Sequence, residues 1–312
     1  MIQIGFDVGG TNIKAGIIRD MKIVTRRSAR FPKEGPYQKV ADVMESMAYE
    51  MLEEQNLNAA EIKSIGIAVA GRLDQTSSIV IDAHNLGFHE VPLKAEMTSR
   101  FKNIPIYLAN DANAAALAEL HAGALIGCKT AVLLTIGTGI GCGLILDGKM
   151  FNGGLGHGVE LGHMTLIYDG PSCTCGNKGC VESVCAATWL AQEGQKAALK
   201  NETGQLYLDA DGLVEKISAK TVIDCAKQGD ADAMEIFDRY IGYLVAAITS
   251  IAAIFDPEVI SIGGGVSLTG SFLFDPLSRL VHKNSFFKYP YKIVPAQLGN
   301  DAGMIGAAML GN

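Results

Sequence analysis

Apolar positions along this chain follow two patterns, which predict strands and helices in alternation. Apolar runs that end in glycine or in Asn-Asp predict buried strands at 62–71, 104–111 and 258–267. Residues 1–16 and 130–146 each read as an apolar strand, a glycine turn and a second apolar strand. Helices are predicted where apolar residues recur at steps of three and four or where alanine dominates, at 40–57, 112–124, 186–199, 221–255 and 302–310. The pattern predicts an α/β protein.

The strand–turn–strand unit is the one evident internal repeat, and it suggests two similar domains, each a mixed sheet flanked by helices. The 312 residues suffice for two domains of ordinary size. We predict an N-terminal domain at 1–118 that is completed by residues 300–312, and a C-terminal domain at 119–299.

Charge and composition narrow the class of protein. The net charge of −7 argues against a nucleic-acid binder, which shows a basic patch or stripe. The N-terminus enters a strand directly, without the charged and apolar regions of a signal peptide. The longest apolar run, Ile241–Phe255, is shorter than the ~20 residues that a membrane span needs, and it is predicted to be a core helix. We therefore expect a cytoplasmic protein with no membrane or nucleic-acid partner.

One histidine and three cysteines have the spacing of a metal site. His163, Cys173, Cys175 and Cys180 read His-x9-Cys-x-Cys-x4-Cys, and one imidazole with three thiolates is a ligand set of closed structural zinc sites. The alternative is free core thiols or disulfides. Disulfide frameworks belong to short secreted chains, so the spacing favours zinc.

Two carboxylates, Glu160 and Glu182, lie on either side of this cluster. They could be solvated loop residues. Because rigid shells around metals are where sites are built, their position favours a functional role.

Glycine turns at three strand ends are candidate phosphate or nucleotide sites. The first, Gly9-Gly10-Thr11-Asn12 with Lys14 nearby, presents backbone N–H groups and hydroxyls that can cradle a phosphate. It could equally be a hairpin that uses Gly-Gly only to reach positive φ. The second is the Thr138-Gly139 turn. At the third, Gly264 and Gly265 could let a base or ribose lie against the backbone, or could form a plain tight turn.

Asp111 lies where a predicted strand stops and a predicted helix starts. Ligands of α/β sheets bind at that edge of the sheet. A carboxylate there can accept the proton of an attacking hydroxyl. The alternative is that Asp111 is the helix N-cap.

Together these segments resemble, over the whole chain, the ROK family of sugar kinases and repressors. DVGGTNIKAG (7–16) is similar to the family's first phosphate loop and IGTGIGCG (136–143) to its second. GVELGH (158–163) with CTCGNKGCVE (173–182) is close to the family signature, and NDANAAALAE (110–119) is similar to the segment that holds the catalytic aspartate.

Two further segments bear on this resemblance. NLGF (85–88) resembles a loop of glucokinases, although those often have Trp near Phe88. His157-Gly158-Val159 departs from the family, whose members usually carry Ala-Gly there.

The resemblance implies a fold and a set of roles. The fold is α/β, with two ribonuclease-H-like (actin-like ATPase) domains, an interdomain cleft and a zinc-bound loop. Asp111 is the implied catalytic base. The sugar hydroxyls would be bound by Asn85, Asn110, Glu160, His163 and Glu182, with His163 also on zinc. ATP and Mg²⁺ would be bound by Asp7, Gly9, Gly10, Thr11, Asn12, Lys14, Thr138, Gly139, Gly264 and Gly265.

The implied function is ATP-dependent phosphorylation of a hexose, with glucose to glucose 6-phosphate first. N-acetylmannosamine, N-acetylglucosamine, allose, fructose or a β-glucoside are alternative substrates. A sugar-sensing repressor of the same family would need a DNA-binding module of roughly 70–80 residues before Asp7, where the sequence leaves no room. An actin-like filament protein would not need the paired-Glu zinc loop. We expect a homo-oligomer, a dimer or a tetramer.

Overall fold

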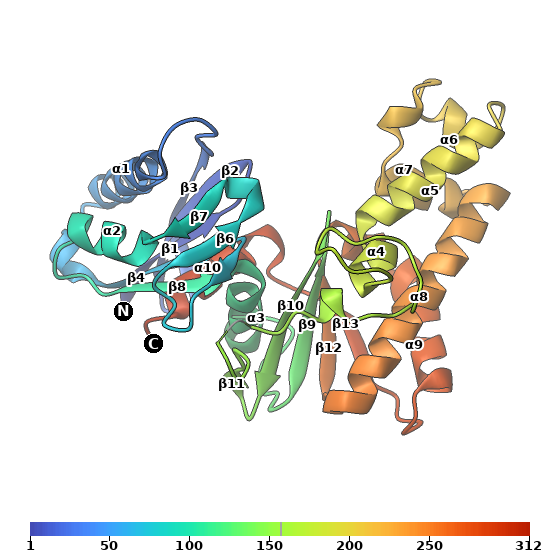
Figure 1. Ribbon diagram of the computed structural model, residues 1–312. Helices are drawn as coiled ribbons and strands as arrows, with labels where there is room; N and C mark the ends of the chain where they lie inside the picture. Colours follow the sequence, from blue (N-terminus) through green and yellow to red (C-terminus); the bar gives the residue numbers. More distant parts are fainter. Residues whose placement is uncertain (157) are drawn as a thin grey trace. The chain divides into compact units, whose positions relative to one another are not determined.

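The computed structural model describes residues 1–156 and 158–312; His157, which departs from the family pattern, lies outside them. The chain forms two compact units (Figure 1). Unit 1 comprises Met1–Lys129, Gly143–Val159 and Gln297–Asn312, and unit 2 comprises Thr130–Cys142 and Glu160–Ala296. The predicted boundary after residue 118 falls inside helix α3 (Asp111–Ala122), and the predicted domain limits stay a prediction.

A five-stranded sheet forms the centre of unit 1. Its strand order is β3-β2-β1-β4-β8, in which β1–β2 and β2–β3 are antiparallel while β1–β4 and β4–β8 are parallel. The outermost strand, β3, alternates exposed and half-buried residues, as expected at an edge, whereas β1 and β4 are almost wholly buried. The strands are β1 (Ile2–Val8), β2 (Asn12–Arg19), β3 (Lys22–Arg30), β4 (Ile62–Val69) and β8 (Ile106–Asn110).

Helices cover both faces of this sheet. On one face, α1 (Gln38–Glu54) adds Met44 to a core that includes Phe6 and Ile65. On the other face, α10 (Ala302–Met309) packs on β1, β4 and α3. Because successive side chains of a strand point to opposite faces, Gly5 faces α10 while Phe6 faces the opposite side.

Two adjacent glycines let α10 lie directly on the backbone of the sheet. Gly5 of β1 is paired with Gly66 of β4. A Cβ at Gly5 would lie 2.0 Å from the carbonyl oxygen of Met304, and one at Gly66 would lie 1.7 Å from that of Ala307. Any side chain at either position would therefore push α10 off the sheet.

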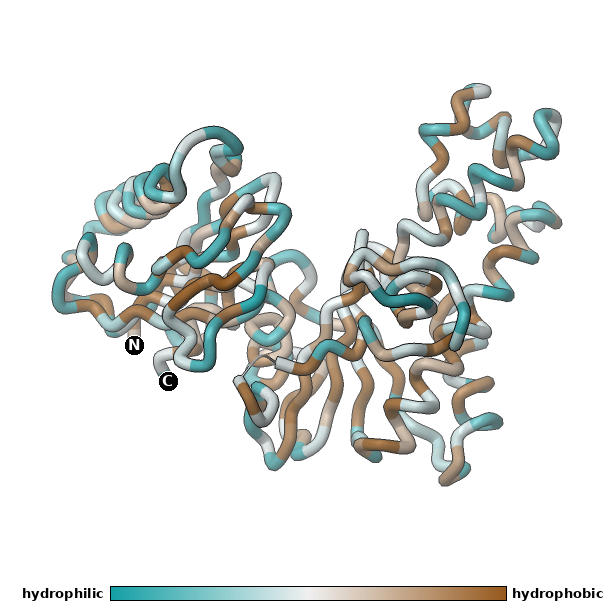
Figure 2. Tube along the Cα trace, in the orientation of Figure 1, coloured by the Kyte–Doolittle hydropathy of each residue, from teal (hydrophilic) through white to brown (hydrophobic). Residues whose placement is uncertain are grey.

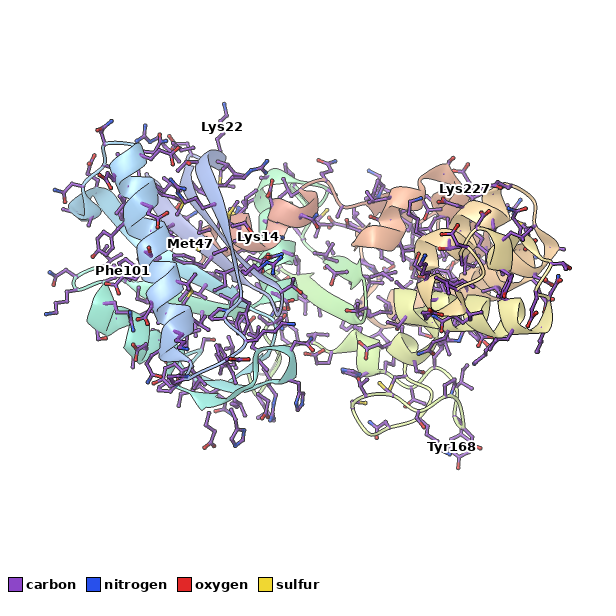
Figure 3. The ribbon with its side chains drawn as sticks, turned by 90° about the horizontal axis from the view of Figure 1, so that it is seen from above. Lys14, Lys22, Met47, Phe101, Tyr168 and Lys227 are labelled. Atoms are coloured by element: carbon purple, nitrogen blue, oxygen red, sulfur yellow. The ribbon has the colours of Figure 1, made fainter. Side chains whose placement is uncertain are left out.

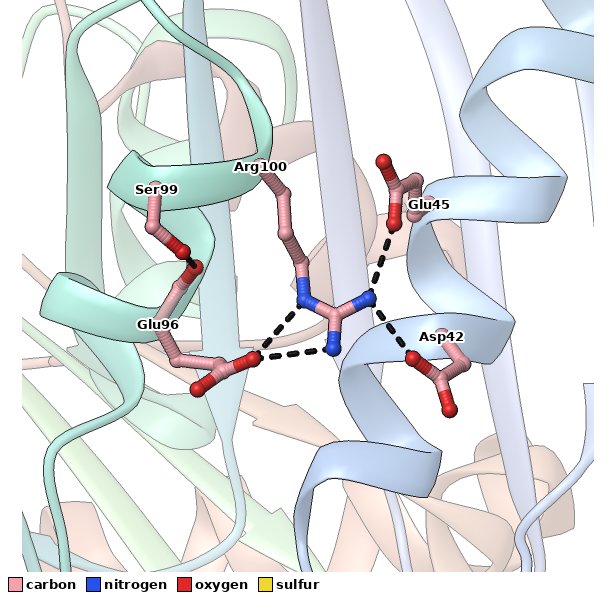
Figure 4. A network of polar contacts seen from close by, with 5 residues as sticks. All are labelled: Asp42, Glu45, Glu96, Ser99 and Arg100. Carbon is pink, nitrogen blue, oxygen red and sulfur yellow. Dashed lines mark hydrogen bonds and ion pairs between the residues drawn. The ribbon is translucent and has the colours of Figure 1, made fainter.

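A small sheet and a second helix complete unit 1. The small sheet has the order β5-β6-β7. The guanidinium of Arg100, in α2, pairs with Glu96 in its own helix and with Asp42 and Glu45 in α1, at 2.7–2.8 Å (Figure 4). These ion pairs join α2 to α1. The elements are β5 (Arg72–Leu73), β6 (Val80–Ala83), β7 (Phe88–Val91), α2 (Leu93–Arg100), and the short 3-10 helices η1 (Ala59–Glu61), η2 (His84–Leu86) and η6 (Gly299–Asp301).

The second five-stranded sheet has the order β11-β10-β9-β12-β13, which is the order of the first sheet with the strands taken in sequence. The internal repeat read from the sequence is therefore repeated in the topology. Strands β9, β12 and β13 run parallel, and β10 pairs antiparallel with β11. The three central strands, β10, β9 and β12, are apolar along most of their length (Figure 2). The strands of this sheet are β9 (Ala131–Ile136), β10 (Ile140–Leu146), β11 (Lys149–Met150), β12 (Val259–Gly263) and β13 (Lys292–Pro295).

Helices account for most of the rest of unit 2. Among the described residues, one helix, α8, is long and apolar enough to cross a membrane. It packs against α4, α5, α7 and α9, and it buries eleven residues, so it is the core helix predicted from the sequence. The helices are α4 (Val181–Cys185), α5 (Ala187–Lys200), α6 (Gln205–Leu208), α7 (Ala219–Lys227), α8 (Ala231–Phe255), α9 (Ser271–Asn284), η3 (Leu161–His163), η4 (Val214–Lys216) and η5 (Gly265–Thr269).

Candidate functional site

The first hairpin, β1 with β2, places a carboxylate and an ammonium group side by side. Asp7 and Lys14 are partners in the β1–β2 register, and Lys14 Nζ lies 3.6 Å from Asp7 Oδ2. Burial raises the pKa of Asp7, and the positive charge of Lys14 opposes that rise only in part. The pair is thus a partly buried charge centre near the hairpin tip.

The tip of the first hairpin, Gly9–Asn12, is held by backbone contacts. Gly9 N–H donates to the carbonyl of Asn12 at 3.1 Å, and Phe31 N–H donates to that of Thr11 at 2.9 Å. Neither tip glycine has a positive φ, so the alternative that Gly-Gly serves only to reach positive φ is wrong. Gly10 is needed for space, because a Cβ there would lie 2.8 Å from the carbonyl oxygen of Asn85.

Asn85 is therefore brought against the first hairpin tip within unit 1. The segment predicted as a loop at 85–88 is in fact a 3-10 turn, η2, followed by Gly87 at φ 64° and by strand β7, which begins at Phe88. The Asn85 side chain is exposed. The turn presents it beside the glycines that were predicted to bind phosphate.

Asn110 and Asp111 lie at the junction of β8 and α3, as predicted. The N-cap is Asn110, whose Oδ1 accepts from Ala112 N at 2.9 Å and from Asn113 N at 3.3 Å. The alternative in which Asp111 is the cap is therefore wrong. Asp111 is the first helical residue, is half-buried, and its Oδ1 accepts from Ala112 N at 2.9 Å.

Both polar atoms of the Asn110 side chain make hydrogen bonds within the fold, because its Nδ2 also donates to the carbonyl of Gly71 at 3.3 Å. This contact joins the end of β8 to the end of β4. The predicted sugar-binding role of Asn110 stays a prediction.

The second hairpin, β9 with β10, has its tip at Gly137–Gly139. Two carbonyls of the tip accept hydrogen bonds from the start of α5: Ala187 N donates to Gly137 O at 2.9 Å, and Thr188 Oγ1 donates to Thr138 O at 3.1 Å. These contacts hold the tip against unit 2's helices.

The third glycine turn follows β12 and lies beside the second hairpin. Gly264 has φ 84°, and a Cβ there would lie 2.2 Å from the carbonyl oxygen of Ile136 in β9. Glycine is thus required both by conformation and by space. Unit 2 therefore brings together Thr138, Gly139, Gly264 and Gly265, four residues predicted to bind nucleotide.

A pocket of about 620 Å³ opens beside these turns within unit 2. Its walls come from α5, α7 and η5, and from Thr138 of the hairpin. The lining is mostly apolar, with alanines and Ile223, and it includes Lys227 (Figure 3). The pocket has the size and the apolar walls of a small-molecule site.

Apart from Thr138 and Gly265, the sequence did not predict the residues of this pocket. In α7, Val222 and Ala226 face the core, as the helical pattern implies, but no sequence signal marks the other face as a wall of a pocket. The wall forms because α5, α7 and η5 meet there, and that meeting depends on tertiary packing.

The predicted metal ligands lie together. The ligand atoms of His163, Cys173, Cys175 and Cys180 are all within 4.8 Å of one another. Cys175 Sγ is 3.7 Å from Cys180 Sγ, and Cys173 Sγ is 3.6 Å from His163 Nδ1. In a tetrahedral zinc site, bond lengths near 2.3 Å to sulfur and 2.0–2.1 Å to nitrogen place two sulfurs about 3.8 Å apart and a sulfur and a nitrogen about 3.6 Å apart. The four residues fit such an ion.

We call residues 163–180 the metal loop. Gly176 has φ 92° and Gly179 has φ 66°, so both bends use the left-handed region that favours glycine. Gly179 also lies against the backbone of Ile167, whose N–H it accepts at 3.1 Å. Tyr168 extends from the loop into solvent and is 96% exposed (Figure 3).

The two predicted carboxylates differ in their surroundings. Glu160 is exposed and directly precedes η3. Glu182 is half-buried in α4, and its Oε2 accepts from Ile140 N at 2.9 Å. Glu182 therefore contacts the start of β10, immediately after the second hairpin tip, and the solvated alternative does not describe it.

The chain is similar to known proteins over nearly its whole length. It is 36% identical to a glucokinase of Thermotoga maritima, with 98% of this chain and 96% of the relative covered. Its structure is similar to that of a ROK family glucokinase from Streptomyces griseus in complex with glucose and AMPPNP (TM-score 0.83, 31% identity, 99% of both chains). It is also similar to a ROK hexokinase from Thermus thermophilus (TM-score 0.84, 30% identity, 99% and 97% covered).

These similarities agree with the sequence and with the fold. The matching strand orders of the two sheets and the two hairpins confirm the predicted class of two ribonuclease-H-like α/β halves, the actin-like ATPase fold. The sequence model of the ROK family matches residues 3–312 of this chain. The chain belongs to the ROK family.

Proposed function

We propose that this protein is an ATP-dependent hexose kinase whose preferred substrate is glucose. The observation that carries the proposal is the full-length similarity to glucokinases, in a chain whose second hairpin tip and third glycine turn lie beside a pocket large enough for a nucleoside. We assign the adenosine part of ATP to this pocket and its phosphates to the hairpin turns.

The chemistry needs a base for the sugar hydroxyl, which is a poor nucleophile. We assign this role to Asp111, because a carboxylate within hydrogen-bond reach can take the proton as the hydroxyl attacks the γ-phosphoryl group. Its position at the end of β8 and the start of α3 supports the assignment. The helix cap there is Asn110, so Asp111 is not needed as the cap. Asn85, Asn110, Glu160, His163 and Glu182 are the proposed ligands of the sugar hydroxyls.

Two metal ions belong to the proposal. Mg²⁺ would neutralise the phosphates of ATP, and Asp7 is its proposed outer partner, supported by its position beside the first hairpin tip. Zn²⁺ would be held by His163, Cys173, Cys175 and Cys180, where it supplies a fixed cross-link of the loop and no chemistry at the phosphoryl group.

A coupled assay of ADP release tests the proposal. The purified protein is given ATP and Mg²⁺ with glucose, N-acetylmannosamine, N-acetylglucosamine, allose, fructose or a β-glucoside, or with no sugar. We expect sugar-dependent ADP release that is greatest with glucose. If no sugar stimulates ADP release, the kinase proposal is wrong, and a sugar-sensing regulator becomes the function to test. If another sugar exceeds glucose in kcat/KM, only the choice of substrate is wrong.

The proposal includes a setting for the enzyme. A hexose kinase of this kind acts in carbohydrate metabolism, at the entry of glucose into glycolysis, and we expect it in the cytoplasm. We further propose a homo-oligomer, a dimer or a tetramer. Light scattering on the purified protein would measure the mass, and a monomer across the micromolar range would contradict this part.

A further inference from the structure

Glu182 lies where the metal loop meets the second hairpin. It is the second residue of α4, a short helix that begins directly after Cys180, and Cys180 is wholly buried. The backbone position of Glu182 is therefore set by a predicted metal ligand two residues earlier.

The carboxylate of Glu182 contacts both structures at once. Oε2 accepts from Ile140 N at 2.9 Å, directly after the hairpin tip. Oε1 accepts from Thr174 Oγ1 at 3.2 Å, and Thr174 stands between Cys173 and Cys175. One side chain thus joins the hairpin to the middle of the metal loop.

The hairpin tip is shaped to receive this carboxylate. A Cβ at Gly139 would lie 2.5 Å from Glu182 Oε2. Gly139 does not have a positive φ, so a side chain there would displace the end of the Glu182 side chain rather than strain the turn. The neighbouring Thr138 lines the nucleotide pocket. A shift of Glu182 would therefore move a wall of that pocket.

We propose that Glu182 is a positioning residue for the nucleotide: it fixes the second hairpin tip and so makes nucleotide affinity depend on the metal loop. The inference rests on the proposed function, in which this hairpin binds the phosphates of ATP. It adds a second role to a residue that is otherwise proposed to bind sugar. Removing the metal should accordingly weaken nucleotide binding, even though none of the four proposed metal ligands lines the pocket.

Glutamine at position 182 separates the positioning role from charge. Its amide oxygen can accept from Ile140 N while its NH₂ group donates to Thr174 Oγ1, because a hydroxyl both donates and accepts. Alanine can do neither. The geometry of the tip should therefore survive Glu182→Gln and be lost in Glu182→Ala.

Calorimetric titration of AMPPNP with Mg²⁺, in the absence of sugar, tests the proposal on the whole chain. We expect Glu182→Ala to raise the Kd by about tenfold or more, the usual value of one hydrogen bond to a charged group. Glu182→Gln should stay within about threefold of wild type, because both hydrogen bonds are retained. Gly139→Ala lies outside the metal loop, and its methyl group would displace the Glu182 carboxylate. This variant should weaken AMPPNP binding as Glu182→Ala does.

The matched control is Asp169→Asn, an exposed carboxylate of the same loop that pairs with Lys178 at 3.0 Å; it should leave the Kd unchanged. Metal content is measured for every variant. If Glu182→Ala loses the metal, the variant is reloaded with Zn²⁺ before titration, because Gly139 itself belongs to the proposed phosphate site and Gly139→Ala alone does not isolate the contact with Glu182. Wild-type affinity in Gly139→Ala, or in a metal-replete Glu182→Ala protein, overturns the inference. A wild-type protein that binds no AMPPNP overturns the proposed function itself.

Discussion

The two hairpins share a topology but differ in what holds their tips. The tip of the first hairpin is closed by its own backbone and by Phe31 N, and it packs against the backbone of Asn85. The tip of the second is held from outside, by the carboxylate of Glu182 and by the start of α5. Equal strand order therefore does not mean equal rigidity. The first tip depends on local structure, and the second depends on a loop that is itself predicted to need a metal.

A second contrast concerns two carboxylates that accept backbone N–H groups. Glu119 in unit 1 is completely buried, and it accepts from Ala124, Gln297 and Leu298 at 2.7–2.9 Å. Glu182 in unit 2 is half-buried and accepts one backbone N–H. The first fixes the segment that leads into α10. The second fixes a hairpin tip. Substitution of Glu119 should therefore lower the stability of unit 1, whereas substitution of Glu182 should weaken nucleotide binding.

The largest expected effect separates catalysis from binding. Asp111→Asn keeps the shape of the side chain but cannot accept the proton, so we expect kcat to fall by about 10²–10⁴-fold, the usual value of general-base catalysis. The sugar Kd should change far less. Steady-state kinetics and calorimetric sugar titration make the measurement.

Glu182→Gln should show the opposite balance in the same assays, with weaker sugar binding and a smaller loss in kcat. A near-normal kcat in Asp111→Asn would mean that the base lies elsewhere, and Glu160 would be the first residue to test.

Glu119→Gln should destabilise unit 1. A glutamine presents one carbonyl oxygen to three backbone donors, and its NH₂ group would face at least one of them. We expect the free energy of unfolding to fall by about 2–4 kcal/mol, the cost of leaving buried partners of a charged group unpaired. Chemical denaturation measures this. Glu202→Gln, at an exposed carboxylate, is the control, and equal stability of the two variants would contradict the role of Glu119.

Cys175→Ala tests whether the second tip depends on the metal loop. We expect loss of the metal and a fall in activity of about tenfold or more, the usual range when support around a metal site is lost. Amide hydrogen exchange sharpens the comparison: the amide of Ile140 should exchange faster, while that of Gly9 should not change. Full activity in a metal-free Cys175→Ala protein, or equal changes in the exchange rates of both amides, would argue against a dependence of the second tip on the metal loop.

The smallest expected effect comes from Asp7. Burial raises its pKa above 3.8, and Lys14 only partly opposes this. Between the unfolded and folded pKa values the folded state therefore binds more protons, so the contribution of Asp7 to stability falls as pH rises through that window. Asp7→Asn should raise the free energy of unfolding by roughly 0.5–1 kcal/mol at pH 7 and by less near pH 3, while it weakens ATP binding. Chemical denaturation at both pH values measures the change in the free energy of unfolding. A variant that is less stable than wild type at pH 7 would contradict the prediction.

Local features could be read from the sequence because local rules decide them. The His-x9-Cys-x-Cys-x4-Cys spacing predicted four side chains that do lie together. The repeated glycine turns predicted two hairpins, and the strand–helix junction placed Asp111 correctly at the start of α3. In each case the residues that form the feature are close together in the sequence, so their spacing along the chain decides it.

What the sequence could not give depends on contacts between distant segments. Gly10 and Gly139 were read as turn glycines, but a side chain at either would meet a distant segment, the backbone of Asn85 in one case and the carboxylate of Glu182 in the other. Whether Asp111 was the helix cap stayed open until the hydrogen bonds of Asn110 Oδ1 gave that role to Asn110, which the sequence had not suggested. Most of the walls of the 620 Å³ pocket gave no signal, because they form only when α5, α7 and η5 pack together.

The packing of α10 directly on Gly5 and Gly66 affects when unit 1 can fold during synthesis. Strands β1 and β4 are translated long before the helix that covers one of their faces, which is made of residues 302–309. Domains generally fold as units during synthesis, N-terminal parts first, at ≈ 5–20 residues per second. Here the face of the first sheet that carries Gly5 and Gly66 stays uncovered until residues 302–309 have been made. Folding of unit 1 should therefore be completed only after α10 has been translated.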